Sequence, residues 1–317
     1  LVTPLLTQLG ELQHTIQMFN DAGIKLYAVS YDDQEALKAY ALGQGIEFTL
    51  FSDPESRVIR QYGVLNTFIE TKDDFYFGIP FPGTFLLDEE GVVVDKLFRP
   101  HLSTRDSGEA MIDRMSGRSL HEDDDPFDSS LEEDGIEVSA FYRGGRGHLR
   151  IGPMSRLMVR FKMPPGIHVY DKPVPEGMVP VSIDLEAPEG VRWEPGERRP
   201  TRSLQIAGIQ EALQVWDDEV EFETLIFGNS TLAPLYESDD LPSITITINV
   251  RYQACDDQQC FLPQSRKLKL NIPMGKTVIP DFEEFRRASA TTVKMDSVEH
   301  WQKLSARQKA QKPDSTS

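Results

Sequence analysis

The chain has 317 residues, of which 39% are hydrophobic and 26% are charged, and its formal net charge is −18. This length is too great for one ordinary core and predicts two domains with connecting segments. The acidic balance argues against nucleic acid and anionic lipid as partners, because both require a basic protein surface. No stretch has the run of apolar residues that spans a bilayer, so no membrane insertion is expected of this portion.

Residues 1–115 alternate helical and strand patterns. The first helix is predicted in "LLTQLGELQHTIQMFNDAG", whose apolar residues recur at three- and four-residue spacing before Gly23. Further elements follow in the order "IKLYAVSYD", "DQEALKAYALGQG", "FTLFSD", "ESRVIRQYGV" and the hairpin "GTFLLDEEGVVVDKLF". This alternation predicts an α/β domain whose partly parallel sheet is covered on both faces.

Two polar segments separate or follow the predicted domains. Within residues 116–135, "HEDDDPFDSSLEEDG" has eight acidic residues between Glu122 and Asp134 and no basic one. We interpret residues 116–135 as a solvated acidic linker. Residues 275–317 are also polar and are predicted to form a short helix near "DFEEFRRA" and then a tail.

Residues 136–274 have an all-β pattern. Short alternating runs are separated by Pro, Gly and Asp: "IEVSAFYR", "RLMVRFKM", "VPVSIDLEA", "EVEFETLIF", "SITITINVRYQ" and "RKLKLNI". Regular short strands without intervening helices predict an antiparallel sandwich of immunoglobulin-like type. In "SITITINVRYQ" every second residue from Ile244 to Val250 is apolar, so this strand is predicted to bury one face and to deliver Cys255 at its end.

The first domain resembles the peroxiredoxin-like AhpC/TSA (redoxin) family of the thioredoxin fold over most of residues 5–115. The resemblance lies in "AVSYDDQEALKAYALGQGIEFTLFSDPESRVIRQYGV" followed by "IPFPGTFLLDEEGVVV". It implies that Pro82 corresponds to the proline that is cis in thioredoxin folds, so the Phe81–Pro82 bond is predicted to be cis. The alternative is an ordinary trans proline at the start of a strand.

The family's reactive cysteine, by this resemblance, stands at the start of the first long helix, where the helix dipole favours a thiolate. Here the region reads "LVTPLLTQLGELQ", and alignment places Val2 and Leu5, or Thr3 and Leu6, near the thiol positions. Residues 1–254 contain no cysteine. The strand that should precede this helix is also absent, so either the sequence is a fragment or the domain is degenerate. We therefore expect a thioredoxin-like domain, N-terminally truncated, without peroxidase chemistry of its own.

The chain has only two cysteines, Cys255 and Cys260, in "YQACDDQQCFLP". A zinc site needs about four ligands, and no further cysteine or neighbouring histidine is present in sequence, so no metal or other cofactor is predicted. A structural disulfide over so short a loop would stabilise the fold by only about 2 kcal/mol. The third interpretation is a redox couple. A disulfide requires the segment 256–259 to turn, because an extended segment holds the two Cα atoms roughly 16 Å apart.

A second resemblance covers roughly residues 136–273. "VRYQACDDQQCFLPQSRKLKLNIP" is similar to the cysteine segment of the N-terminal, immunoglobulin-like domain of DsbD-type thiol:disulfide interchange proteins, and "GIHVYDKPVPEGMVPVSIDLEAPEGV" to its first strands. In that family the pair passes reducing equivalents to periplasmic proteins and is shielded by a cap loop, whose counterpart here is expected at 210–216. The resemblance implies a periplasmic or other extracytoplasmic location. No leader is visible, and the first residue is Leu1 rather than Met, as expected if a leader has been removed.

Together these features predict an oxidoreductase that exchanges thiols and disulfides through Cys255 and Cys260. Its expected partners are proteins that bear thiols or disulfides, and the redoxin-like domain would serve for docking or spacing. The alternative is a non-enzymatic scaffold protein with a permanent disulfide. The reduction potential distinguishes the two, because a permanent structural disulfide lies below about −300 mV.

Overall fold

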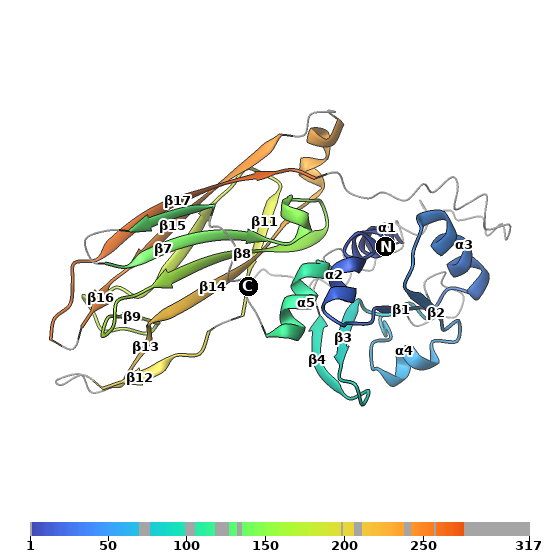
Figure 1. Ribbon diagram of the computed structural model, residues 1–317, viewed down its shortest axis with the longest axis horizontal. Coiled ribbons are helices and arrows are strands. Elements are labelled where there is room, and N and C mark those ends of the chain that lie inside the picture. The colour runs from blue at the N-terminus through green and yellow to red at the C-terminus, as the bar shows by residue number, and fades with distance from the viewer. Residues whose placement is uncertain are drawn as a thin grey trace, which may run out of the picture.

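The computed structural model describes residues 2–69, 77–98, 105–117, 127–131, 135–197, 199–205, 211–237, 242–256 and 258–275. An α/β unit is followed in the chain by a β-sandwich, and the two lie side by side in Figure 1. The predicted order, an α/β domain and then an all-β sandwich, is confirmed. Within the described residues, no helix has the length and apolar character needed to cross a membrane.

The α/β unit contains two strand pairs with helices around them. Its helices are α1 (Val2–His14), α2 (Ile16–Asp21), α3 (Gln34–Gln44), α4 (Arg57–Gln61) and α5 (Gly108–Ser116). Its strands are β1 (Tyr27–Ser30), β2 (Thr49–Ser52), β3 (Gly83–Leu87) and β4 (Val93–Phe98). The pair β1–β2 is parallel and the hairpin β3–β4 is antiparallel. In the described residues these pairs form two separate sheets rather than the single partly parallel sheet that the sequence predicted.

Capping residues set the limits of α3, which the sequence predicted. The carboxylate of Asp33 accepts a hydrogen bond of 2.8 Å from the backbone N–H of Ala36, which satisfies one of the free donors of the first turn. At the other end Gly45 takes the left-handed conformation, with φ of 61°, and ends the helix.

The first predicted helix is broken at Thr15, so it forms α1 and α2 rather than one helix. The Thr15 hydroxyl donates to the carbonyls of Glu11 and Leu12, a local bond that competes with the helix ladder. The start of α5 packs against this break. A Cβ atom at Gly108 would lie 2.2 Å from the Thr15 hydroxyl oxygen, so only glycine fits there. The sequence analysis did not predict α5, although Ser107 caps its start and Gly117 its end.

The core of the α/β unit lies between these helices and the two strand pairs. Buried apolar side chains from α1, α2, α3, β4, α5 and the connection before β2 form one cluster: Leu9, Leu12, Phe19, Tyr40, Phe48, Leu97, Met111 and Ile112. Tyr40 belongs to this apolar cluster, and burial raises the pKa of its hydroxyl above the ordinary value. The predicted apolar face of the first helix is thus the face that the core uses.

The described residues of the β-sandwich form three sheets. The largest has the order β11–β14–β8–β7–β6, with β5 paired in parallel to β8; the others are β10–β15–β17 and β12–β13–β9–β16. The strands of the largest sheet are β5 (Arg105–Asp106), β6 (Asp128–Leu131), β7 (Glu137–Arg143), β8 (Pro153–Lys162), β11 (Val191–Pro195) and β14 (Glu219–Gly228). Those of the other two are β9 (His168–Tyr170), β10 (Ser182–Glu186), β12 (Arg202–Leu204), β13 (Leu213–Asp217), β15 (Ser243–Tyr252), β16 (Ala254–Cys255) and β17 (Gln264–Pro273). Short 3₁₀ helices η1 (Gly145–Gly147) and η2 (Ser230–Glu237) lie in connections.

The sandwich core forms as the alternating pattern of β15 predicted. Its four apolar residues Ile244, Ile246, Ile248 and Val250 are all buried. They join one cluster with buried side chains of β7, β8, β14 and β17, so the β10–β15–β17 sheet faces the largest sheet across a single core.

The predicted acidic linker is not wholly irregular. Residues 128–131 form β6, which pairs antiparallel with β7 and places Ser129 opposite Ser139. Residues 118–126 and 132–134 of that segment lie outside the described part of the chain, as does the predicted helix and tail after Gly275. The edge of the largest sheet therefore recruits a strand from a segment whose composition alone suggested a solvated linker.

The prediction of a cis bond before Pro82 is wrong. Among the described residues the cis peptide bond is Lys172–Pro173, so Phe81–Pro82 is trans. The backbone at this point is extended: the Phe81 N–H donates to the Val64 carbonyl over 2.6 Å, and β3 begins at Gly83. An extended entry into a strand needs no tight turn, so the ordinary preference for the trans form decides the isomer.

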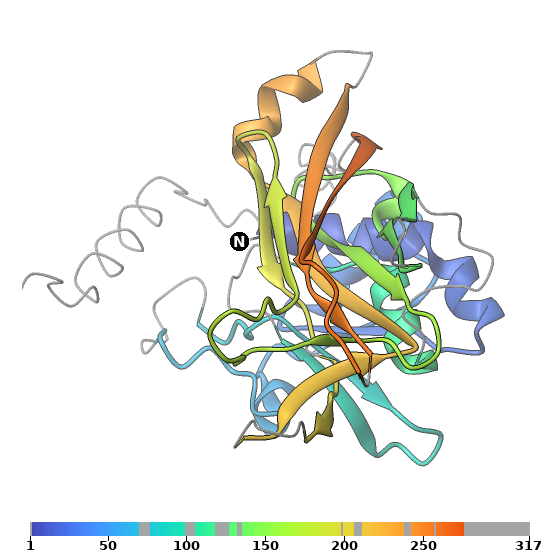
Figure 2. The same ribbon diagram turned by 90° about the vertical axis from the view of Figure 1, so that its left-hand side faces the viewer.

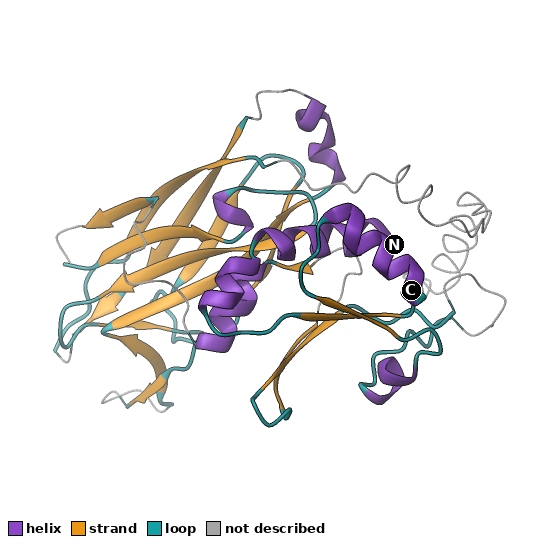
Figure 3. Cartoon of the chain, turned by 45° about the vertical axis from the view of Figure 1, so that its right-hand side comes forward, coloured by secondary structure: helices purple, strands orange, loops and turns teal. Residues whose placement is uncertain are grey.

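The two units meet through α1, α5 and β5. Figure 3 shows these helices between the strands of the sandwich and the smaller strands of the α/β unit. Four sandwich arginines contact two helix carboxylates: Arg146 and Arg150 reach Glu11, and Arg143 and Arg156 reach Asp113. The backbone N–H of Arg146 also donates to Glu109 over 2.9 Å. In these contacts every acid belongs to the α/β unit and every base to the sandwich.

Candidate functional site: the Cys255–Cys260 disulfide

Cys255 and Cys260 form a disulfide bond at the end of the β15 segment. Cys255 lies in β16, at the edge of the β12–β13–β9–β16 sheet, where it pairs with His168 of β9. The chain then reverses, so that Cys260 lies opposite Cys255 in an antiparallel bridge with 4.0 Å between their Cα atoms. The turn that the sequence required over 256–259 is therefore present.

Asp256 builds this turn. Its carboxylate accepts hydrogen bonds of 2.7 Å from the backbone N–H groups of Gln258 and Gln259, and its own N–H donates to the Gln259 carbonyl. These backbone donors, Gln259 first, hold the pKa of the Asp256 carboxyl below its ordinary value, and His168 lowers it further. An aspartate that bonds amides two and three residues ahead stabilises a reversal.

Gln253 fixes the base of the hairpin to a neighbouring loop. Its side-chain amide donates to the Phe261 carbonyl over 3.0 Å and accepts from the Val179 N–H over 3.1 Å. The backbone N–H of Gln253 also donates to the Val179 carbonyl. The strand that leads into Cys255 and the strand that leaves Cys260 are thus held together by one buried side chain.

The two sulfur-bearing residues differ in exposure. Cys255 is 1% exposed and packs in a small cluster with Tyr170, Leu213 and Val215. Cys260 is exposed to solvent. The two residues are therefore inequivalent toward a large partner, because Cys260 reaches the surface and Cys255 does not.

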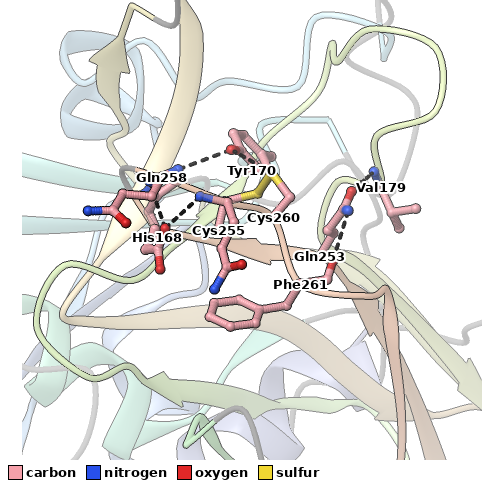
Figure 4. The surroundings of a disulfide bond; sticks show 10 residues. His168, Tyr170, Val179, Gln253, Cys255, Gln258, Cys260 and Phe261 are labelled. Atoms are coloured by element: carbon pink, nitrogen blue, oxygen red, sulfur yellow. Dashed lines mark hydrogen bonds between the residues drawn. A yellow bond between two sulfur atoms is a disulfide. The ribbon is translucent and has the colours of Figure 1, made fainter.

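Two residues of β9 lie beside the bond, as Figure 4 shows. The Tyr170 hydroxyl is 3.9 Å from the Cys260 sulfur and 3.0 Å from Nε2 of His168. The two rings meet edge to face with centroids 5.2 Å apart, and His168 is 3% exposed. His168 thus packs its ring within β9. The contact between Tyr170 and Cys260 was missed, since nothing in the sequence places β9 against β16.

The predicted cap loop is wrong for the residues that the structure describes. Residues 213–217 form β13, which is hydrogen-bonded to β12 on one side and to β9 on the other. Leu213 and Val215 lie in the cluster that holds Cys255, so they support the bond from within the sheet. Gln210 lies outside the described residues. A strand paired on both edges does not move aside as a loop does.

The positions aligned with the family's thiols lie in α1, far along the chain from the disulfide. The backbone of Val2, Thr3, Leu5 and Leu6 is helical, while their side chains are outside the described part of the structure. Pro82, the other predicted position of this domain, lines a surface cavity of about 490 Å³ with Tyr62, Phe85, Lys96 and Phe98. This cavity has an aromatic lining and no sulfur.

The disulfide and the α/β unit lie at opposite ends of the sandwich. Residue Arg150, which contacts Glu11, lies beside Met274 just past the end of β17, because Leu149 and Met274 form a bridge. The disulfide lies before the start of the same ten-residue strand. At about 3.3 Å per residue, β17 alone separates the two ends by about 33 Å. Figure 2 looks onto the disulfide end, with the blue α/β unit behind the sandwich.

Comparison with known proteins identifies relatives of the α/β unit. Residues 3–96 match the AhpC/TSA family. A putative peroxiredoxin bcp of Coxiella burnetii is 36% identical over 76 residues, which is 23% of this chain and 46% of that protein. The chloroplastic peroxiredoxin Q of Sedum lineare is 32% identical over 77 residues, 24% of this chain and 38% of that protein. Alkyl hydroperoxide reductase C of Amphibacillus xylanus is 33% identical over 92 residues, 27% of this chain and 44% of that protein. The chain thus spans less than half the length of these curated relatives.

Solved structures overlap with the chain at low scores. The N-terminal periplasmic domain of ScsB from Proteus mirabilis has a TM-score of 0.31 and 18% identity over 50% of this chain and 56% of that one. The reduced N-terminal domain of DsbD from Neisseria meningitidis has a TM-score of 0.23 and 11% identity over 37% and 77%. The yeast GGA1 GAE domain has a TM-score of 0.25 and 9% identity over 45% and 96%. The β-sandwich is defined here by its own strand order and core. Residues 3–96, which match the AhpC/TSA family, contain no cysteine.

Proposed function

We propose that this protein exchanges thiols and disulfides with partner proteins through the Cys255–Cys260 pair. The observation that supports this most is the inequivalence of the two residues, a buried Cys255 bonded to an exposed Cys260 at the free end of the sandwich. A purely structural disulfide does not require an exposed cysteine, whereas exchange requires that an incoming thiolate reach one of the two cysteines.

The difference in exposure supports a different role for each cysteine. A partner thiolate attacks the Cys260 sulfur, a new bond forms between the partner and Cys260, and the Cys255–Cys260 bond breaks. The electron pair of that bond goes to Cys255, which leaves as a thiolate and takes a proton from solvent. A second partner thiolate then attacks the partner's own sulfur and releases Cys260. The pair gains two electrons and two protons, and the partner dithiol becomes a disulfide.

The α/β unit has a supporting role in this proposal. It contains no cysteine, and α1 and α5 join it to the end of the sandwich away from the disulfide. We assign it to docking or spacing, with the redox chemistry confined to the sandwich. An extracytoplasmic location, in the periplasm or an equivalent compartment, fits a centre that cycles through a disulfide, because reducing cytosol keeps most thiols reduced.

A redox titration tests the proposal. The protein is equilibrated with glutathione or dithiothreitol couples, the free thiols are alkylated, and the fraction reduced is read by mass. A working couple should titrate well above about −300 mV. A reduction potential below about −300 mV would identify a permanent structural disulfide and favour the scaffold alternative. The buried ion pairs between the two units and the hydrogen bonds of Gln253 are also compatible with a scaffold.

A further inference from the structure

The residues beside the disulfide form a short hydrogen-bonded chain that leads to one sulfur. Tyr170 is fully buried, and its hydroxyl lies 3.9 Å from the Cys260 sulfur and 3.0 Å from Nε2 of His168 (Figure 4). Residues 168 and 170 of a strand point to the same face of their sheet, so the two rings are held over the same side of β9.

The chemistry of the disulfide fixes the direction of these bonds. A disulfide sulfur carries no hydrogen, so in the Tyr170–Cys260 contact the hydroxyl must donate. A tyrosine hydroxyl has one proton, so in its contact with His168 the same oxygen must accept. Both bonds form together only when Nε2 of His168 carries its proton. The order is therefore His168 to Tyr170 to the Cys260 sulfur.

We propose that Tyr170 is a catalytic residue of the exchange reaction, which donates a hydrogen bond to the Cys260 sulfur, and that His168 is the positioning residue that holds the Tyr170 hydroxyl toward it. The inference rests on the proposed function. A donor at the sulfur stabilises the Cys260 thiolate, because hydrogen bonds to an ionised acceptor are the stronger ones. Tyr170 therefore assists Cys260 both as a leaving group and, in the reverse direction, as a nucleophile.

The step that Tyr170 assists is the second one. The partner's second thiolate attacks the partner sulfur of the mixed disulfide, the partner disulfide forms, and the bond to Cys260 breaks. Its electron pair goes to the Cys260 sulfur, at which the Tyr170 hydroxyl donates. In the reverse direction the Cys260 thiolate attacks a partner disulfide and the partner's leaving sulfur takes the electron pair.

The charged neighbours make such a donor useful. Asp256 lies in the hairpin turn, Asp171 follows Tyr170, and Asp217 of β13 pairs with His168. These carboxylates disfavour a second negative charge nearby and so raise the pKa of a thiol among them. Arg202 pairs with Asp217 over 2.6 Å, and His168 is the basic group that reaches the sulfur, through Tyr170. Thus the hydrogen bond opposes the acidic surroundings at one sulfur and not at the other.

The experiment measures the pKa of the Cys260 thiol. In a Cys255→Ser background, the rate of alkylation by iodoacetamide is recorded against pH and the modified peptide is confirmed by mass. Tyr170→Phe, which removes only the hydroxyl, should raise the pKa of Cys260 by about one unit, a tenfold loss of thiolate below it. His168→Phe should raise the pKa of Cys260 by less than Tyr170→Phe does. His168→Gln retains an N–H donor, so its Cys260 pKa should lie nearer to that of the Cys255→Ser protein.

Tyr142→Phe is the matched control, because it removes another sandwich tyrosine hydroxyl, which donates to the His148 carbonyl over 3.0 Å. It should leave the Cys260 pKa unchanged. An unchanged or lower pKa in Tyr170→Phe would overturn the proposal; if that variant does not fold, an unchanged pKa in His168→Phe would do so. The assay uses the free thiol, so it tests the Tyr170 hydrogen bond even if the redox titration of the wild type identifies a permanent staple.

Discussion

At the scale of single residues, the two cysteines are chemically different although they share a bond. Cys255 lies under Tyr170, Leu213 and Val215, while Cys260 faces solvent. A thiol reacts as its thiolate and only where a reagent can reach it. Burial in apolar surroundings opposes both conditions at Cys255.

We expect the single-cysteine variants to react at different rates. With Ellman's reagent, Cys255→Ser, which retains Cys260, should react at least roughly tenfold faster than Cys260→Ser, which retains Cys255. Stopped-flow absorbance gives both rates, and unfolding in urea should abolish the difference. Equal rates in the folded proteins would contradict the assignment of Cys260 as the attacked sulfur.

Asp256 provides a pH-dependent test of the hairpin turn. Its pKa is lowered from an ordinary 3.8 by the N–H donors of Gln259 and Gln258, so the carboxylate stabilises the turn fully above pH 3.8. This stabilisation is lost as the pH falls through the lowered pKa. Carbon-detected NMR of the side chain should give a value below 3.8. In Asp256→Ala, which removes the acceptor oxygen, the N–H groups of Gln258 and Gln259 should exchange with solvent faster at neutral pH, and unchanged protection would argue against the turn.

At the scale of elements, α5 carries the contacts that join the two units. Asp113 is 1% exposed and contacts Arg143 and Arg156, which belong to β7 and β8. The helix is short, but its position is fixed from both sides, by the break at Thr15 and by the sandwich arginines. The element that the sequence analysis omitted is the one that holds the domains together.

We expect Asp113→Asn to destabilise the protein by about 3–5 kcal/mol, because it removes the buried carboxylate that pairs with the buried Arg156 and the half-buried Arg143. Urea unfolding followed by circular dichroism measures the change. The matched control is Asp95→Asn: Asp95 pairs with Arg114 in a partly exposed position, so its loss should cost at most about 1 kcal/mol. Similar losses of unfolding free energy in the two variants would contradict a buried ion-pair contact between the two units at Asp113.

Alanine substitutions at two helical glycines distinguish the effect of close packing from the effect of helix propensity. Gly108→Ala forces a Cβ against the Thr15 hydroxyl and should cost about 1–3 kcal/mol. Gly43→Ala, in α3 where nothing lies within 4 Å of the added Cβ, should instead stabilise the protein by about 0.5–1 kcal/mol. Thermal unfolding of both variants checks the signs. A stabilised Gly108→Ala would contradict the close packing of α5 on Thr15.

At the scale of the whole molecule, the disulfide and the α/β unit are separated by the length of the sandwich. Under the proposed function, the separation of about 33 Å along β17 and the buried ion pairs at the other end favour exchange with a separate partner over exchange with the α/β unit of the same chain. The AhpC/TSA-family segment has no cysteine to receive electrons.

We therefore expect no cysteine-dependent peroxide reduction by the α/β unit, because threonine and leucine cannot form a thiolate or a sulfenic acid. Hydrogen peroxide consumption is measured for the wild type and for the variant with both Cys255→Ser and Cys260→Ser. The double variant should match the protein-free blank. Turnover that persists in it would contradict the confinement of redox chemistry to the sandwich.

The sequence by itself determined those features that depend on local pattern. Alternation from Ile244 to Val250 predicted the buried face of β15, and Asp33 and Gly45 lie at the limits of a helix that formed as expected. The spacing of Cys255 and Cys260 required a turn, and Asp256 supplies it. Periodicity, capping and turn chemistry act over a few residues, so the residues themselves carry the information.

Only the tertiary structure decided which distant segments meet. It placed residues 213–217 in a paired strand instead of a cap, left Pro82 trans, and brought Tyr170 to Cys260 across 90 residues of chain. It also buried Asp113 against arginines of two strands. Each of these outcomes depends on how sheets pair and how units pack, and no local pattern encodes those long-range choices. The difference in exposure between Cys255 and Cys260 arises in the same way, because the sheet that covers Cys255 is assembled from separate parts of the chain.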